Sequence, residues 1–282
     1  MNASLSPQGY TVIEVMIFLA ISTLMLVSAV ITVGGQQAKI QYAQAMRDVE
    51  SKIQDVMSDI STGYYPQASF ECIVNNFAPN DKPMLNPGSN TQGTNEPCTF
   101  IGKVLQFSPG GSADGLNIFT VIGRRQTPQG TRLRQVSSLE EANPVALATA
   151  PADLTEEDSL RFGLQVPVDG MKYGSPGSYT PIGAMGFFSS FGQYNTAGNN
   201  LLSSAQKLNL AWVPGTSLGD SKSTVAAAIE NITDASGSST LNPESIVICF
   251  EDANSDQRGF ITIGGSGRQL TTELILDGEC PS

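Results

Sequence analysis

The stretch Gly9-Tyr10-Thr11-Val12-Ile13-Glu14 opens an apolar run that continues without a break to Val33. Glu14 is the only charged side chain between Tyr10 and Val33. A helix rises about 1.5 Å per residue, so residues 10–33 would form a rod of roughly 36 Å, and the hydrocarbon layer of a bilayer is about 30 Å thick. The run therefore predicts a transmembrane helix.

Glu14 is the anomaly in this run. A carboxylate in apolar surroundings costs several kcal/mol unless another group pairs with it. The nearest side-chain cations, Lys39 and Arg47, lie beyond the apolar run. We therefore expect the partner of Glu14 to come from outside the run.

The same residues resemble the class III signal of type IV pilins and pseudopilins, in which a prepilin peptidase cuts after a glycine and methylates the new amine. The resemblance makes Gly9 the cleavage residue, Tyr10 the first mature residue and Glu14 the fifth. It implies that Glu14 pairs with the Tyr10 amine of a neighbouring subunit. Such a pair would set the stagger of helices in a filament, as buried polar groups set register in coiled coils.

The resemblance also implies partners and a location. The expected partners are other pilin subunits, the prepilin peptidase, the pilus assembly machinery and, before assembly, membrane lipid. We expect a single-pass membrane protein that becomes part of an extracellular filament (a fimbrium), with its head outside the cytoplasm. A chain of 282 residues is larger than the usual major subunit of the family, which favours a minor or specialised pilin.

Two other interpretations of the apolar run are open. In the first, Val27-Ser28-Ala29 serves as the small-residue cleavage site of an ordinary secretory signal peptide. In the second, the run stays uncleaved and anchors an extracellular binding or adhesion module. The mature N-terminus separates the three cases: methylated Tyr10, a cut at Ala29, or intact Met1.

The helix is expected to continue past the membrane. Gly34 and Gly35 weaken it by about 1 kcal/mol each relative to alanine. Thr62-Gly63 then provides a left-handed cap, and Pro66 prevents the helix from resuming. Between these points apolar residues recur at spacings of three and four and form one stripe: Tyr42, Met46, Val49, Ile53, Val56 and Ile60. The pattern predicts one helix from Tyr10 to about Ser61.

The chain thus divides into a leader (1–9), a helix (10–62, with 10–33 transmembrane and 34–62 amphipathic) and a β-rich head (63–282). Residues 64–100 are rich in proline and predict a loop, and 220–231 predict a short helix. The fold class is α+β, which the resemblance refines to a long helix packed on an antiparallel sheet. Short runs rich in β-branched and aromatic residues predict strands at 100–105, 116–124, 131–136, 182–188, 207–213, 245–251, 259–263 and 270–276.

Four cysteines, Cys72, Cys98, Cys249 and Cys280, suit an exported chain with two disulfides. Three connectivities are possible, and proximity in sequence favours Cys72 with Cys98 and Cys249 with Cys280. Pilin-like proteins commonly close their C-terminal region with a disulfide, so the resemblance gives Cys280 the role of holding the tail.

Composition argues against catalysis. The chain has no histidine, which excludes histidine general bases, histidine metal ligands and Ser-His or Cys-His pairs. Gly215-Thr216-Ser217-Leu218-Gly219 fits the pattern of a nucleophile elbow, but the base it needs is missing. We therefore expect no catalytic residue, no cofactor and no enzyme activity.

Two weaker candidate binding sites follow from clustered side chains. Arg124, Arg125, Arg132 and Arg134 flank a hairpin tip at 126–130 and could hold a phosphate backbone, although a net charge of −11 makes nucleic acid an unlikely partner. Asp252, Asn254 and Asp256 alternate like calcium ligands. Gln257 and Ile263 stand where an EF-hand needs Gly and Glu, so a solvated hairpin turn is favoured.

A run of aromatic residues, Phe187, Phe188, Phe191 and Tyr194, is interleaved with small and polar residues. It could form an exposed adhesive loop. Aromatic side chains are more often part of the core than of a contact surface, so core packing is the favoured interpretation.

Overall fold

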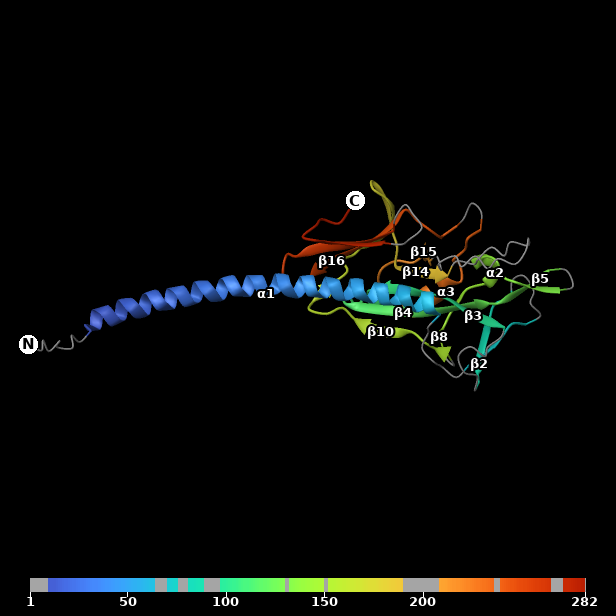
Figure 1. Ribbon diagram of the computed structural model, residues 1–282, viewed down its shortest axis with the longest axis horizontal. Coiled ribbons are helices and arrows are strands. Elements are labelled where there is room, and N and C mark those ends of the chain that lie inside the picture. The colour runs from blue at the N-terminus through green and yellow to red at the C-terminus, as the bar shows by residue number, and fades with distance from the viewer. Residues whose placement is uncertain are drawn as a thin grey trace, which may run out of the picture.

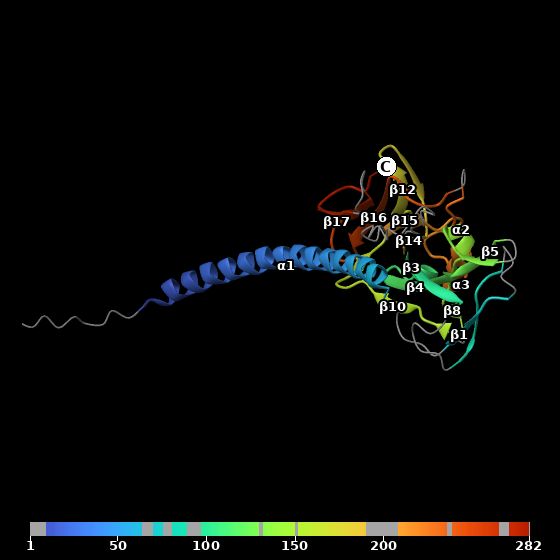
Figure 2. The same ribbon diagram turned by 45° about the vertical axis from the view of Figure 1, so that its right-hand side comes forward.

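We describe the fold from a computed structural model of the chain (Figure 1). It describes residues 10–63, 70–75, 81–88, 97–129, 132–149, 152–189, 208–235, 239–264 and 271–281. One long helix, α1, projects from a β-rich head, so that the start of the helix lies far from every sheet (Figures 1 and 2). The fold class is α+β, as predicted.

Helix α1 spans Val12–Thr62 without interruption, and it passes through Gly34 and Gly35. Thr11 is its N-cap, and Gly63 is its C-cap with a left-handed φ of 71°. The N–H of Gly63 donates to the carbonyl oxygens of Asp59 and Ile60, which satisfies two groups that a helix end leaves free. The predicted helix and its end at Thr62-Gly63 are confirmed.

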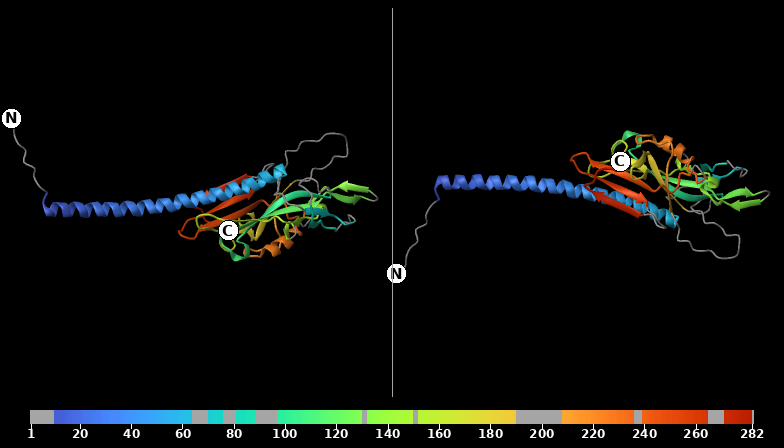
Figure 3. Two further views of the ribbon diagram at one scale, coloured as in Figure 1. Left: turned by 90° about the horizontal axis from the view of Figure 1, so that it is seen from below. Right: turned by 90° about the horizontal axis from the view of Figure 1, so that it is seen from above.

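The C-terminal half of α1 lies against both large sheets, and its apolar stripe forms part of the main core. All six residues of the predicted stripe are buried, together with Ala45. The stripe packs on side chains from one sheet, such as Leu105 and Phe187, and from the other, such as Ile248 and Ile261. Figure 3 shows this half of the helix lying along the head while the other half extends beyond it.

The first large sheet has the order β10-β4-β3-β14-β15, with β7 also paired to β4, and all its pairings are antiparallel. Strands β3 and β4 are almost wholly buried because elements cover both faces. Its strands are β3 (Cys98–Phe107), β4 (Gly115–Arg124), β7 (Val145–Ala146), β10 (Glu156–Ser159), β14 (Ala184–Ser189) and β15 (Leu208–Trp212).

The second large sheet has the order β13-β12-β16-β17-β18, with β11 also paired to β16. The strands predicted at 245–251, 259–263 and 270–276 are confirmed as β16, β17 and β18, which pair in chain order as an antiparallel meander. The strands of this sheet are β11 (Leu164–Gln165), β12 (Met171–Ser175), β13 (Ser178–Pro181), β16 (Ser245–Asp252), β17 (Arg258–Gly264) and β18 (Thr271–Leu276).

Two short helices cover the face of the first sheet that α1 leaves free. They are α2 (Leu139–Ala142) and α3 (Lys222–Ile229), and α3 lies within the predicted short helix. Their apolar residues form a second core with Ile101, Phe119 and Val121 of the sheet. The smaller elements are the pairs β1 (Phe70–Ile73) with β2 (Met84–Pro87), β5 (Gln126–Gln129) with β6 (Arg132–Gln135) and β8 (Ala148–Thr149) with β9 (Ala152–Asp153), and the turn η1 (Pro109–Gly111).

Two disulfides cross-link the head, with the pairing that sequence proximity favours. Cys72 on β1 joins Cys98 on β3, with the Cα atoms 6.1 Å apart. Cys249 on β16 joins Cys280 near the C-terminus, with a Cα separation of 5.7 Å. Strands β1 and β2 lie in a segment for which the sequence predicted only a loop, and the first disulfide fixes that segment to the sheet.

Candidate assembly surface

The exposed half of α1 is the most unusual surface of the molecule. Val12–Val30 is the one helix among the described residues that is long and apolar enough to cross a membrane, with a mean hydropathy of 2.3. None of it is buried inside the chain. Large side chains such as Phe18 and Leu24 are 71% and 74% exposed, so this surface requires lipid or protein to cover it.

Two hydroxyl side chains of this half bond to the backbone of the helix itself. The hydroxyl of Thr23 donates to the carbonyl oxygen of Leu19, and the hydroxyl of Ser28 donates to that of Met25 at 2.9 Å. Such bonds remove the free donors that apolar surroundings would penalise. Glu14 is the charged group on this surface, and a carboxylate in apolar surroundings calls for a partner.

Glu14 sits in the first turn of α1, where its backbone is already capped. Its N–H donates to the Thr11 side-chain oxygen at 3.3 Å and to the Thr11 carbonyl oxygen at 3.1 Å. Thr11 and Glu14 thus occupy the N-cap and N3 positions of α1, and a carboxylate in this first turn is favoured by the helix dipole. The T-x-x-E spacing of Thr11 and Glu14 is a sequence signal for this helix start, additional to those described above.

The predicted processing site lies at the edge of the described chain. Tyr10 is non-helical and 81% exposed, four positions before Glu14. Gly9 and the rest of the predicted leader lie outside the described residues. The start of α1 at Val12 leaves Tyr10 just outside the helix.

The predicted basic cluster is not a single exposed patch, and this corrects the sequence interpretation. Arg124 is buried, and its Nε donates to the carbonyl oxygen of Glu141 at 2.6 Å while its guanidinium also bonds Thr127 at 3.2 Å. Burial lowers the pKa of the Arg124 guanidinium, although Asp81 and Glu141 act against that shift. Arg124 therefore fixes the base of the hairpin to α2 and does not face solvent.

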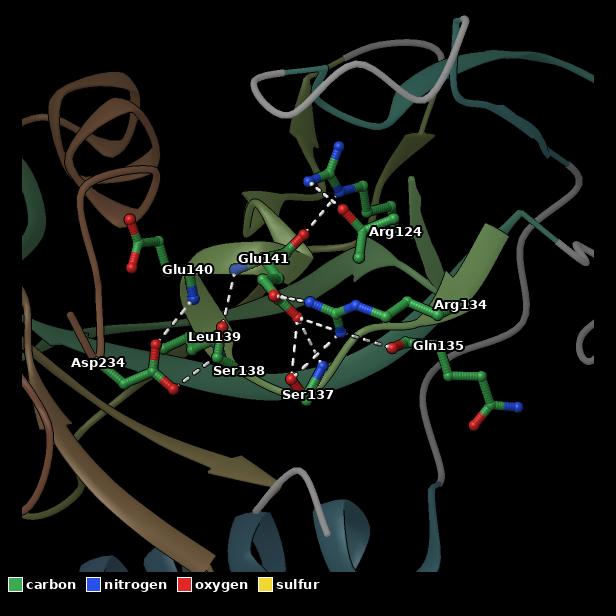
Figure 4. A network of polar contacts seen from close by, with 10 residues as sticks. Arg124, Arg134, Gln135, Ser137, Ser138, Leu139, Glu140, Glu141 and Asp234 are labelled. Atoms are coloured by element: carbon green, nitrogen blue, oxygen red, sulfur yellow. Dashed lines mark hydrogen bonds and ion pairs between the residues drawn. The ribbon is translucent and has the colours of Figure 1, made fainter. Parts of the chain in front are cut away.

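Arg134 is also engaged, as Figure 4 shows. It forms a two-pronged ion pair with the Glu141 carboxylate, one arm of which is 3.0 Å long. Hydrogen bonding to Arg134 lowers the pKa of the Glu141 carboxyl, with burial opposing and Ser137 assisting the shift. Only Arg125 and Arg132 of the four remain exposed. Two arginines on an acidic protein form a poor phosphate-binding surface.

Helix α2 lies at the centre of these polar contacts, and the sequence patterns described above did not predict it. Ser138 caps it by accepting from the Glu141 N–H at 3.1 Å, and the Asp234 carboxylate accepts from the N–H groups of Leu139 and Glu140 at 2.9 Å each (Figure 4). Ser138 and Glu141 have the S-x-x-E spacing of a helix start, and the Glu141 carboxylate accepts from the Ser137 N–H at 2.9 Å. These contacts are structural and bring no reactive groups together.

The candidate calcium residues form a hairpin turn between β16 and β17. The Asp252 carboxylate accepts from the N–H of Asn254 at 3.0 Å and from the Ser255 hydroxyl, which closes the turn on itself. Within the described part of the chain, no group of three His, Cys, Asp or Glu side chains could hold a metal ion. The geometry fits the solvated turn, with Asp252 and Asn254 used for turn contacts.

Two other sequence patterns prove to be structural. Phe187 and Phe188 are buried in β14, which confirms core packing for them, while Phe191 and Tyr194 lie outside the described residues. Around Ser217, both Gly215 and Gly219 adopt left-handed φ values of 70° and 90°. The segment is thus a glycine turn.

Comparison with known proteins adds no relative. No protein-family model matches the chain, and neither a curated protein nor a solved structure shows significant similarity to it.

Proposed function

We propose that the chain is a type IV pilin-like filament subunit, of a minor or specialised kind, that assembles through α1 after a prepilin peptidase removes residues 1–9. The observation that carries the proposal is the division of one continuous helix. Its N-terminal half is apolar and uncovered, and its C-terminal half is built into the core of the head.

The physical argument starts from the uncovered half. An apolar surface of this length is stable only in lipid or against other apolar helices. Lipid would cover it before assembly, and the same half of neighbouring subunits would cover it in the filament. Because α1 has no break, the head would follow wherever the exposed half packs.

Glu14 and Tyr10 supply the alignment step of the proposal. Removal of the leader would place a new amine on Tyr10, four residues before Glu14. A Glu14 carboxylate paired with the Tyr10 amine of the adjoining subunit would be neutralised in the apolar filament core. Only one stagger between helices allows that pairing, so the pair would set the register.

The refinement from α+β to a pilin-like fold belongs to the same proposal. It is supported by the packing of α1 on antiparallel sheets and by the C-terminal disulfide of Cys249 with Cys280. Disulfides persist in oxidising compartments, which favours a head outside the cytoplasm. We propose an extracellular filament as its final location.

A second candidate is a membrane-anchored extracellular binding or adhesion module whose anchor is never cleaved. The place of Glu14 in the first turn of α1 favours it, because the helix dipole stabilises a carboxylate there even in a lone helix. Under this alternative the apolar half stays in lipid.

Mass spectrometry of the mature protein tests the proposal. Methylated Tyr10 at the N-terminus is the expected result. An intact Met1 would support the uncleaved anchor, and a cut at Ala29 would show that α1 is removed as a signal peptide. Isolation of the filament and measurement of the stoichiometry of this subunit would then separate a minor from a major role.

A further inference from the structure

Strand β10 is an edge strand with an unusual composition. Its sequence is Glu156-Glu157-Asp158-Ser159, and all four side chains are exposed to solvent. It pairs with β4 through the register of Glu156 with Ile118 and Asp158 with Leu116. Adjacent carboxylates repel one another, and no apolar side chain of β10 holds the strand in place.

Each acidic residue of β10 instead meets a lysine from a different element. Glu156 lies 3.0 Å from Lys103 Nζ on β3, Glu157 lies 3.2 Å from Lys222 Nζ on α3, and Asp158 pairs with Lys52 on α1. Successive side chains of a strand point to opposite faces. Glu156 and Asp158 therefore meet the α1 side of the sheet and Glu157 the α3 side, so lysines hold β10 from both faces.

Lys103 links β10 to α1. Its side chain is only 2% exposed, and its Nζ lies 2.8 Å from Asp59 of α1 as well as 3.0 Å from Glu156. Burial disfavours the charged ammonium, but hydrogen bonds to Asp59 and Glu156 raise the pKa of Lys103 overall. A buried ammonium is costly unless carboxylates pair with it, so Lys103 needs both Asp59 and Glu156. The last turn of α1 and strand β10 are therefore both held in place by Lys103.

A groove separates β10 from α1 further along the helix. It has a volume of about 280 Å³ and is lined by Asp48, Lys52 and Asp55 of α1 and by Asp158 and Arg161. The Lys52–Asp158 ion pair bridges it. Charged side chains therefore line this groove together with apolar ones such as Val49 and Leu116.

We infer that residues 153–160 form an electrostatic latch, a segment whose carboxylates pair with lysines on both faces of the sheet and which fixes the C-terminal turns of α1 in the head. The latch opens as one unit when the Lys103 ammonium is removed. Leu154 and Leu160, which are half-buried and buried, anchor its two ends. The latch concerns packing inside one subunit, so it does not rest on the proposed filament function. Opening would loosen the last turns of α1 around Lys52 and Asp59, whose ion pairs it removes, and uncover the edge of β4.

The test is amide hydrogen exchange of the full chain in detergent micelles, read by mass spectrometry on peptides covering 156–159, 52–62 and 246–250. Lys103→Met removes the ammonium and keeps the aliphatic stem. We expect exchange to become at least about tenfold faster in 156–159 and in 52–62 together, with 246–250 unchanged. Lys82→Met is the matched control, since it removes the Lys82–Glu230 ion pair elsewhere in the head and should change none of the three segments.

A second variant distinguishes the latch from general loosening. Glu157 contacts only Lys222 among the three lysines, so Glu157→Gln should speed exchange in 156–159 and leave 52–62 unchanged. Glu156→Gln replaces Lys103→Met if the latter does not fold, with the same expectation. Wild-type exchange in Lys103→Met, or equal acceleration in all three segments, would overturn the inference. So would acceleration of 52–62 in Glu157→Gln.

Discussion

The Tyr42 hydroxyl donates a hydrogen bond of 3.3 Å to the carbonyl oxygen of Phe250, a residue 208 positions later in the chain. The contact joins α1 to β16 at the point where the helix enters the head. Burial, with Asp277 and Asp252 nearby, raises the pKa of Tyr42, so the phenol stays protonated and remains a donor. From Tyr42 to Ile60 one face of the helix is packed in the core.

The buried stripe predicts a sharp contrast within one helix. Ile53→Ala removes a fully buried side chain and should lower the free energy of unfolding of the head by about 2–5 kcal/mol. Ile40→Ala, 66% exposed on the same helix, should change it by less than about 0.5 kcal/mol. Denaturant unfolding of the detergent-solubilised chain, followed by near-UV circular dichroism, measures both. Equal effects would contradict the packing.

The two disulfides should stabilise the head by similar amounts. They close loops with sequence separations of 26 and 31 residues, for which chain entropy gives about 3–4 kcal/mol each. Cys72→Ser with Cys98→Ser, and Cys249→Ser with Cys280→Ser, should therefore lower the unfolding free energy comparably. A denaturant titration of each double variant tests this, and a loss under about 1 kcal/mol in either would argue against that cross-link.

Arg124 and Arg132 should respond differently to the same change. Arg124→Gln withdraws hydrogen bonds from the Glu141 carbonyl and Thr127 in a buried site, so it should destabilise the head by about 1–3 kcal/mol. Arg132→Gln, at an exposed position, should be nearly neutral. An electrophoretic shift assay with duplex DNA should find no salt-sensitive binding for the wild type or for either variant. A band shift lost in Arg132→Gln would revive the nucleic-acid hypothesis.

The Arg134–Glu141 ion pair should make hairpin docking depend on pH. The folded-state pKa of Glu141 lies below its ordinary value of 4.5. A depressed carboxyl pKa adds stability above the unfolded pKa and loses it as pH falls through the folded pKa. The wild type should therefore exceed Glu141→Gln in stability at neutral pH, and the gap should close in acid. A gap that persists well below pH 4.5 would show that the charge is not responsible.

Glu14 offers the most direct test of the assembly proposal. Glu14→Ala should reduce incorporation into filaments by at least about tenfold, because the Tyr10 amine of the neighbour would lose its counter-charge in apolar surroundings. Glu14→Gln is the informative control, since glutamine serves at the N3 position of a capping box but carries no charge. Both variants should fail to assemble, as judged by quantitative immunoblotting of sheared filaments.

The opposite result has a clear meaning. If Glu14→Gln enters filaments at the wild-type level while Glu14→Ala does not, the side chain acts through helix capping alone. If Glu14→Ala also enters normally, the alignment role is wrong.

The parts of the fold that depend on local pattern were predictable. The stripe from Tyr42 to Ile60 repeats every three to four residues, and Gly63 adopts the left-handed cap that its position suggests. The strands of the C-terminal meander follow from β-branched and aromatic runs. These signals lie within short windows of sequence.

The contacts that depend on distant partners were not predictable. Nothing near Lys103 in sequence indicates that Asp59 and Glu156 neutralise it, although a lone lysine in the apolar run Phe100–Phe107 is a signal for a buried ion pair. Arg124 was wrongly expected in an exposed basic cluster for a related reason. It lies next to the hairpin in sequence, but its side chain is directed toward α2, which begins 15 residues later in the chain. Two N-caps, Thr11 and Ser138, are each followed three residues later by a glutamate, and this signal was visible in the sequence and overlooked.

The uninterrupted course of α1 has a mechanical consequence. Its 51 residues make a rod of about 76 Å, and the C-terminal half of this rod packs along its side against the head. A pull on the head against a fixed N-terminus would therefore load the buried stripe in shear, with every turn from Tyr42 to Ile60 sharing the tension at once. Peeling, in which contacts fail one after another, would require the pull to come from the side.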